Sequence, residues 1–310
     1  MTLTGAVLVT RGSTIVYEAY TDTAGPGTRF QIASLSKQFT AAAALLLAGD
    51  GLLSLSDPMA HRLPGSPAAW AGITAHHLLT HTSGLPHWDA ATGSGPRVPL
   101  SRADTAARVM RLLPLTAPGR RWRYSSPGYV LAALLIEYVT GHPYQDILRD
   151  RVLDPLSLHH TGTGDGTGSG ATDPSCLPGA GDLWSTARDL ARWARALEQG
   201  RLLGPGPLHL MFTAHAVPEP HGHTPLTATG YGYGVFLGTL SGHPARFHHG
   251  DNPGHRSLLV RLPHLDTGIV ILSRGNDTDP YTTLTTLLTT PTLRPLHSRH
   301  PPKTRPPGDS

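Results

Sequence analysis

The chain has 310 residues, 39% of them hydrophobic, so it can bury a large core as one large domain or two interleaved domains. Its formal net charge is +4 at pH 7, but residues 291–310 hold four basic residues against one acidic residue. The rest of the chain is therefore nearly neutral, which argues against a nucleic-acid-binding surface. The single cysteine, Cys176, excludes an internal disulfide framework and a cysteine-rich metal site, and its Gly/Pro/Thr-rich surroundings favour a spare thiol over a nucleophile.

The first residues show no export signal. Met1–Val9 lacks a basic segment followed by a long apolar one, and it runs straight into a predicted strand. The longest strongly apolar segment, Ala41–Ala48, is too short to cross a bilayer. These features predict a cytoplasmic protein with no membrane partner, unless translation starts upstream of Met1.

Strand patterns lie near both ends of the chain. Ala6–Val9 and Thr14–Tyr20 are rich in β-branched residues and are joined by a short turn, which predicts a hairpin. The pattern resumes after the middle of the chain. The strands predicted there are Tyr231–Thr239, Ala245–His249, Ser257–Leu262 and Gly268–Ser273.

Helical patterns lie between these strands. Ala33–Leu47 is almost wholly apolar and free of Gly and Pro, which predicts a buried helix. Later helices are predicted to start at the capping residue Ser101, to span Gly128–Thr140 and Tyr144–Val152, and to start at Thr186.

Strands at both ends around a helical middle predict an α+β fold, with an antiparallel sheet built from both termini and an inserted all-α lobe. The expected division gives the sheet domain residues 1–57 and 207–290. The helical lobe takes residues 58–206. The Pro- and Arg-rich residues 291–310 are expected to be a disordered tail.

Ser34 and Lys37 form a Ser-x-x-Lys pattern at the start of the first predicted helix. Residues three apart on a helix are neighbours, so Lys37 is expected to lie over Ser34. Of the 25 basic residues only Lys37 and Lys303 are lysines, and an ammonium, unlike a guanidinium, can be tuned to lose its proton. The pattern predicts a serine nucleophile whose proton is taken by an amine. Because a bare Ser-x-x-Lys is more often an N-cap serine beside a solvated lysine, the prediction needs support from other segments.

Two other segments carry residues suited to the same chemistry. Tyr124, in Tyr124-x-Ser126, precedes a buried helix, where a phenol with a lowered pKa could act as a base. Gly250, in His248-His249-Gly250, would let a backbone N–H approach a substrate carbonyl. Taken singly, each pattern also fits a core tyrosine or a bulge with two surface histidines.

In this order, Ser34-x-x-Lys37, Tyr124-x-Ser126 and His248-x-Gly250 resemble the serine hydrolase family of class C β-lactamases, penicillin-binding DD-peptidases and related esterases. The resemblance covers roughly residues 5–290. It implies a β-lactamase/transpeptidase-like fold and no cofactor. Supporting segments that also match the family are Leu79–Pro86, Asp182–Trp193 and Asn252–Gly254.

The resemblance also implies roles for individual residues. Ser34 would attack the acyl carbonyl, while Lys37 and Tyr124 would share its proton and return it to the leaving group. Which of these two is the general base stays open. The backbone N–H groups of Ser34 and Asp251 would form the oxyanion hole. The residues implied in substrate binding are Ser126, His248, His249 and Gly250.

Two departures from the family pattern restrict the substrate. Ser126 stands where the family usually has an asparagine, and His248 stands where true lactamases have a lysine that binds the substrate carboxylate. We therefore expect a hydrolase of small esters, amides or D-amino-acid peptides that acts through an acyl-serine. The alternatives are a biosynthetic acyltransferase, a true β-lactamase or DD-carboxypeptidase, and a catalytically silent binding protein.

Other catalytic classes fit the sequence poorly. His77-x-x-x-His81 has the spacing of a helical zinc site but lacks the glutamate of His-Glu-x-x-His, so we predict no metal site and no catalytic role for His81. The absence of a Gly-x-Ser-x-Gly elbow and of a phosphate-binding glycine loop argues against an α/β-hydrolase and a nucleotide-binding protein. The expected partner is a small-molecule acyl substrate.

Overall fold

The computed structural model of this chain describes residues 5–21, 23–88, 101–164, 177–219, 225–275, 278–291 and 293. The spare thiol of Cys176 lies outside the described residues. So does most of the segment predicted to be a disordered tail.

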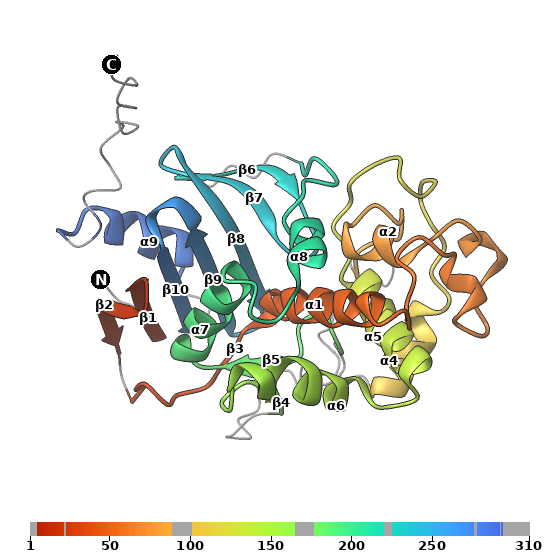
Figure 1. Ribbon diagram of the computed structural model, residues 1–310, viewed down its shortest axis with the longest axis horizontal. Coiled ribbons are helices and arrows are strands. Elements are labelled where there is room, and N and C mark those ends of the chain that lie inside the picture. The colour runs from red at the N-terminus through yellow and green to blue at the C-terminus, as the bar shows by residue number, and fades with distance from the viewer. Residues whose placement is uncertain are drawn as a thin grey trace, which may run out of the picture.

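A seven-stranded antiparallel sheet joins the two ends of the chain, in the order β2-β1-β10-β9-β8-β7-β6 (Figure 1). β1 (Gly5–Arg11) pairs with β2 (Thr14–Tyr20) as the predicted hairpin, and on its other side with β10 (Thr267–Arg274). The C-terminal strands thus complete a sheet that the N-terminal hairpin begins, which confirms the predicted α+β fold. The other strands are β6 (Leu226–Tyr231), β7 (Phe236–Leu240), β8 (His243–Asn252) and β9 (His255–Leu262).

Helices cover both faces of this sheet. Successive residues of a strand point to opposite faces. Val270 of β10 therefore joins a core with α1 (Ser36–Gly49) and α7 (Ala187–Glu198), whereas its neighbour Ile271 joins a core with α9 (Pro280–Leu288) on the other face. The sheet is consequently the middle layer of three.

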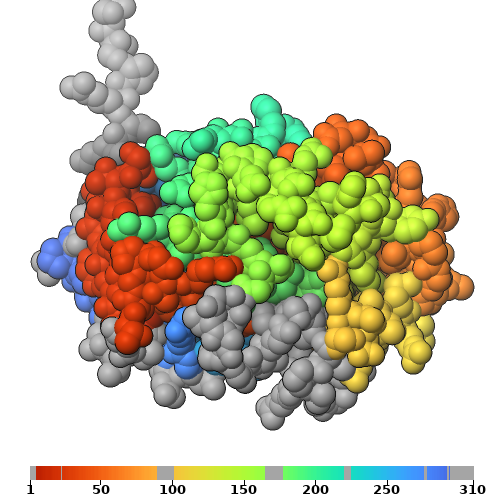
Figure 2. Space-filling view, turned by 90° about the horizontal axis from the view of Figure 1, so that it is seen from below, coloured from red at the N-terminus to blue at the C-terminus, as the bar shows by residue number. Residues whose placement is uncertain are grey.

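The helical lobe lies at the far end of α1 from the β1–β2 hairpin (Figure 1). Figure 2 shows the same separation, with the N-terminal segment in red at one end and lobe residues in orange and yellow at the other. Ser101 caps α4 by accepting a hydrogen bond from the backbone N–H of Asp104, and Gly141 ends α5 with a φ of 71°, as the sequence predicts. The helices of the lobe are α2 (Ala75–Leu79), α4 (Arg102–Val109), α5 (Ser126–Thr140) and α6 (Tyr144–Leu148).

α7 packs against β1 and β10. It therefore covers the sheet, although it lies within residues 58–206, the range expected for the helical lobe. Its start at Thr186 was predicted correctly, but a sequence pattern does not say which layer of the fold a helix will cover. The division of the chain into two domains stays a prediction.

The predicted strand Tyr231–Thr239 is wrong, because a turn splits it into β6 and β7. Gly234 has a φ of 72°, and a Cβ there would lie 2.8 Å from the carbonyl oxygen of Lys37, so the turn packs directly on α1. The sequence also did not indicate the helices α8 (Pro205–Met211) and α9. Nor did it indicate a small sheet of β3 (Phe30–Gln31), β5 (Leu183–Ser185) and β4 (Gly162–Thr163), which are too short to show a pattern.

Several single turns complete the described structure. A π-helical turn, Arg149–Leu153, continues α6 and replaces the end of the helix predicted to reach Val152. The 3-10 turn Ala33–Leu35 leads into α1 and carries Ser34. The other 3-10 turns are Met59–His61, Ala68–Trp70, Asp154–Leu156 and Pro263–Leu265.

Candidate active site

Ser34 and Lys37 meet where the sheet adjoins the helical lobe. Ser34 lies in the turn before α1 and Lys37 in the first turn of α1, so that Lys37 Nζ lies 2.9 Å from Ser34 Oγ. The structure thus brings the two side chains together as their spacing predicts. Ala33, just before the serine, has a φ of 47°, a conformation that non-glycine residues rarely adopt and that often marks functional sites.

Lys37 is completely buried, at 0% exposure. Its ammonium donates hydrogen bonds to Ser34 Oγ at 2.9 Å, Ser126 Oγ at 3.2 Å and the carbonyl oxygen of Ala180 at 2.6 Å. Burial lowers the pKa of Lys37 to about 7, although the negative charge of Asp182 acts to raise it. A large fraction of Lys37 is therefore neutral near pH 7 and able to accept a proton.

Asp182 is the buried carboxyl group that acts on Lys37. Its Oδ1 accepts a hydrogen bond of 3.1 Å from the backbone N–H of Gly179, and burial raises its pKa to about 7. Because each group affects the charge of the other, the two titrate as a coupled pair. The sequence placed Asp182 only in a supporting segment, and no local pattern indicated that it lies near Lys37.

Tyr124 and Ser126 form the wall of the site facing Lys37. Ser126 is the first residue of α5, and the Tyr124 ring centroid lies 5.0 Å from Lys37 Nζ. Burial raises the pKa of Tyr124, while hydrogen bonds to Ser34 and Ser126 lower it less strongly. The expectation of a lowered pKa for this phenol is therefore wrong, because desolvation of the phenolate outweighs these hydrogen bonds.

β8 packs directly against the turn that carries Ser34. A Cβ on Gly250 would lie 2.4 Å from the carbonyl oxygen of Ile32 and 2.4 Å from Ser257 Oγ, so only glycine fits there. Ser257 Oγ donates a 2.7 Å hydrogen bond to the same carbonyl and fixes the contact. The next residue, Asp251, lines the pocket at Ser34. Its role in the oxyanion hole stays a prediction.

His248 does not occupy the substrate-binding place expected for it. The side chain is fully buried, with Nδ1 2.6 Å from the carbonyl oxygen of His249 and Nε2 3.1 Å from Tyr231 Oη. On β8, successive side chains point to opposite faces, so His249 lines the pocket instead. The substrate contact predicted for His248 is therefore wrong, whereas the contact predicted for His249 stays a prediction.

A chain of hydrogen bonds runs behind the pocket from His81 to His248. The backbone N–H of Ser125 donates to His81 Nδ1 at 3.2 Å, so the proton of His81 is on Nε2, which lies 3.1 Å from Tyr231 Oη. Burial lowers the pKa of His81 well below its ordinary value and keeps the ring neutral. Its ring centroid lies 4.4 Å from that of Tyr124. His81 therefore supports the wall that carries Tyr124.

A pocket of about 340 Å³ opens at Ser34. It includes predicted residues from all three motifs, together with residues that sequence reasoning missed. His87 Nδ1 accepts a 3.2 Å hydrogen bond from the backbone N–H of Ser126, and no sequence pattern indicated it. The missed or merely supporting residues that line the pocket are His87, Trp88, Leu177, Ala180, Phe236, Asn252 and Pro253.

The structure also bears on the zinc alternative. His77 Nδ1 lies 3.1 Å from Thr74 Oγ1 in a capping box, and both ring nitrogens of His81 have hydrogen-bond partners. Among the described residues, no group of three or more His, Cys, Asp or Glu side chains is arranged to hold a metal ion. Over the same ranges of the chain, none of the helices has both the length and the apolar character needed to span a membrane.

Comparison with known proteins finds a matching family model and similar penicillin-binding proteins. The family model described as Beta-lactamase matches residues 1–290. Penicillin-binding protein 4* of Bacillus subtilis is 36% identical over 43% of this chain and 30% of its own length. Penicillin-binding protein 4 of Amycolatopsis lactamdurans is 29% identical over 79% of this chain and 72% of its own length. The chain therefore spans less than a third of the first of these relatives.

Solved structures show the same fold. A penicillin-binding protein from Bacillus halodurans superposes with a TM-score of 0.78 at 24% identity, covering 93% of this chain and 96% of that one. A D-stereospecific amidohydrolase from Streptomyces sp. superposes with a TM-score of 0.77 at 27% identity, covering 88% and 90%. Together with the site geometry, these similarities support serine hydrolase chemistry. The chain belongs to the beta-lactamase family.

Proposed function

We propose that this protein is a serine hydrolase that cleaves small esters, amides or D-amino-acid peptides through an acyl-enzyme on Ser34. One observation carries the proposal: the completely buried amine of Lys37 lies 2.9 Å from Ser34 Oγ. With a pKa lowered to about 7, Lys37 is a base matched to neutral pH, which is where general-base catalysis is most effective.

In the acylation step, neutral Lys37 takes the hydroxyl proton of Ser34 while Oγ attacks the acyl carbon. The tetrahedral intermediate collapses, the bond to the leaving group breaks, and the leaving oxygen or nitrogen takes up a proton. Tyr124 keeps its own proton because burial raises its pKa. The phenol is therefore suited to donate to the leaving group and to recover that proton from Lys37, which favours Lys37 as the general base in this proposal.

In the deacylation step, a water molecule replaces the leaving group. Lys37 takes a proton from this water as its oxygen attacks the acyl carbon. The Ser34 Oγ–acyl bond then breaks, and Lys37 returns the proton to Oγ, which gives a carboxylic acid and the free serine. The backbone N–H groups of Ser34 and Asp251 would stabilise the oxyanion in both steps. The close packing at Gly250 supports this role, because it brings β8 against the Ser34 turn.

The substrate class follows from what the third motif lacks. His248 is buried and bonded to Tyr231, so this position offers no cation to a substrate carboxylate. That argues for esters and amides over β-lactams. The structure of a D-amino acid amidase from Ochrobactrum anthropi, 25% identical over 88% of this chain with a TM-score of 0.75, adds support for amides of D-amino acids.

The test is intact-protein mass spectrometry after incubation with a fluorophosphonate, a penicillin and a set of p-nitrophenyl esters. We expect one fluorophosphonate adduct per chain, absent in Ser34→Ala and present in the control Ser56→Ala, which changes an exposed serine. Ester turnover should exceed penicillin turnover by at least about tenfold in kcat/KM.

Other outcomes would redirect the assignment. A labelled Ser34→Ala variant would remove Ser34 as the nucleophile. A penicillin turned over faster than every ester would favour the lactamase alternative. An acyl adduct that is released by an added amine or alcohol but not by water would favour the acyltransferase, and a chain that forms no adduct would favour a binding protein.

A further inference from the structure

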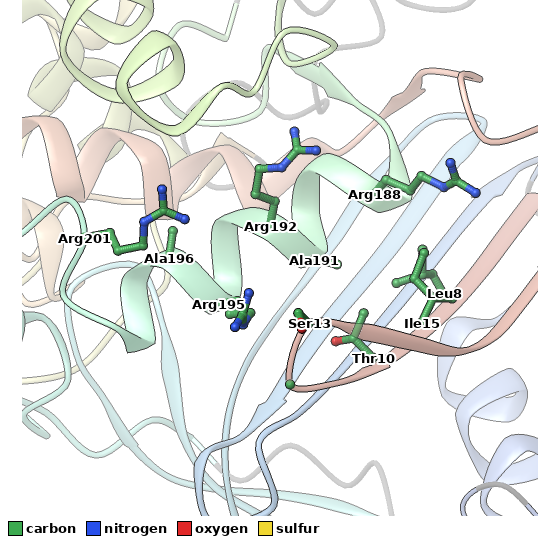
Figure 3. Close-up of a pocket in the computed structure, with 11 residues that line it drawn as sticks. Leu8, Thr10, Ser13, Ile15, Arg188, Ala191, Arg192, Arg195, Ala196 and Arg201 are labelled. Atoms are coloured by element: carbon green, nitrogen blue, oxygen red, sulfur yellow. The ribbon is translucent and has the colours of Figure 1, made fainter.

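A second hollow lies on the sheet side of the molecule, away from Ser34. It is a groove of about 330 Å³ between α7 and the β1–β2 hairpin, and it shares no lining residue with the pocket at Ser34. Figure 3 shows four arginines spaced along α7 and the segment that follows it, with Thr10, Ser13 and Ile15 of the hairpin opposite. The arginines are Arg188, Arg192, Arg195 and Arg201.

Their spacing places three of the arginines on one face of α7. Arg188, Arg192 and Arg195 are four and three residues apart, so they are neighbours on the helix surface. Like charges at this spacing repel and destabilise a helix. Repulsion among these arginines therefore lowers the stability of the helix, and the packing of α7 against the sheet does not require it.

Two of the four arginines are already neutralised. Arg188 donates two 2.8 Å hydrogen bonds to the carboxylate of Glu18, and Arg192 donates at 3.1 Å to Asp189. Arg195 and Arg201 have no carboxylate partner within the described parts of the chain. The Nε of Arg195 is also buried without a hydrogen-bond partner there, and a buried charged donor without an acceptor is costly.

The rest of the groove is apolar or carries hydroxyl groups. Leu8 and Ala191 form part of its lining, with Ile15 at 41% exposure on the hairpin side. Thr10 and Ser13 supply the hydroxyl side chains. A ligand for such a groove would combine an anionic head, held by the arginines, with an apolar portion beside the aliphatic side chains.

We propose that the α7–hairpin groove binds a phosphate monoester that carries a small apolar group. Phosphate is the favoured anion because the planar guanidinium donates two parallel hydrogen bonds to it, and because its two negative charges match the two arginines left without a carboxylate. The phosphate belongs either to a soluble metabolite or to a lipid headgroup. This inference is independent of the reaction at Ser34.

Isothermal titration calorimetry with phenyl phosphate tests the soluble source, and co-sedimentation with phosphatidylcholine vesicles, with and without phosphatidic acid, tests the lipid source. We expect binding with one phenyl phosphate per chain. Arg195→Gln should weaken it at least about tenfold, the effect of losing a charge-assisted pair of hydrogen bonds. Arg195→Lys keeps the charge but not the planar fork, and should bind with intermediate affinity.

Two further variants control the test. Arg201→Gln, at an exposed position, should also weaken binding and remains informative if Arg195→Gln lowers stability. Arg108→Gln removes an exposed arginine from the last turn of α4, as Arg195 lies in the last turn of α7, and should bind as the wild type does.

Binding of the phosphatidic acid vesicles alone, lost in Arg195→Gln and Arg201→Gln, would assign the site to a lipid headgroup. Failure of the wild type to bind either probe, or equal binding by all four variants, would overturn the proposal.

Discussion

Two regions of the protein hold cations in contrasting surroundings. Lys37 is completely buried where the sheet meets the helical lobe, whereas four arginines line the open α7–hairpin groove. Burial makes the charged form of Lys37 costly and lowers its pKa to about 7, but an arginine stays charged in either place. A buried lysine is therefore suited to proton transfer, whereas a set of surface arginines is suited to holding an anion.

Replacing the buried lysine by arginine, and a groove arginine by lysine, should give the largest difference between the two regions. Lys37→Arg keeps the positive charge but cannot accept the proton of Ser34, so we expect acylation to slow by about 10²- to 10⁴-fold. The measurement is the rate of fluorophosphonate labelling at pH 7. The reverse exchange in the groove, Arg195→Lys, should leave that rate unchanged. A Lys37→Arg variant that labels at the wild-type rate would show that Lys37 serves only as a charge.

Removing the phenol of the site should have a smaller effect. Tyr124→Phe leaves Lys37 as the base but removes the donor to the leaving group, so we expect ester kcat/KM to fall by about 10²-fold. Because burial raises the pKa of Tyr124, the phenol stays protonated at neutral pH, and the rise of kcat/KM with pH should persist in the variant. Loss of this rise would transfer the role of base to Tyr124.

Asp182 adjusts Lys37 without reacting. Its negative charge raises the pKa of Lys37, so Asp182→Asn should lower that pKa further. Since only neutral Lys37 is active, kcat/KM falls as pH drops through this pKa, and in the variant the fall should begin at a lower pH. The measurement is a pH profile of ester turnover. Asp189→Asn, which changes a buried carboxyl group on α7, should leave the profile in place. A profile unchanged by Asp182→Asn would mean that the pair is not coupled.

The hydrogen-bond chain behind the pocket should contribute to stability more than to chemistry. Tyr231→Phe keeps the ring but leaves His81 and His248 without the hydroxyl between them, and we expect the free energy of unfolding to drop by about 1–3 kcal/mol. Chemical denaturation measures this loss. Tyr138→Phe, at 53% exposure, should change the stability little. Equal stability of the two variants would show that these hydrogen bonds add nothing to the stability of the fold.

Patterns local in sequence predicted the fold well. The β1–β2 hairpin, the buried helix after Ser34 and the caps at Ser101 and Gly141 follow from residues a few positions apart. The failures share a cause. The Gly232–Gly234 turn and the short strands β3 to β5 are set by packing against distant segments, for which the sequence has no local signal.

The residues of the candidate site also fall into those set by local sequence and those set by the tertiary fold. Ser34 and Lys37 were predicted because a helix turn sets their distance. Asp182 and His87 could not be predicted, since only the tertiary fold brings them to Lys37 and Ser126. His248 was misplaced because a motif gives the position of a residue on a strand but not the face that its neighbours bury.

The most direct test of the central claim is to titrate Lys37 itself. Only Lys37 and Lys303 are lysines, so protein labelled with ¹³C at lysine Cε gives two NMR signals, and Lys37→Arg assigns them. We predict that the Lys37 signal titrates near pH 7, well below the ordinary lysine value of 10.5. A Lys37 that keeps its proton to about pH 10 would contradict the account, because a permanently charged amine cannot activate Ser34.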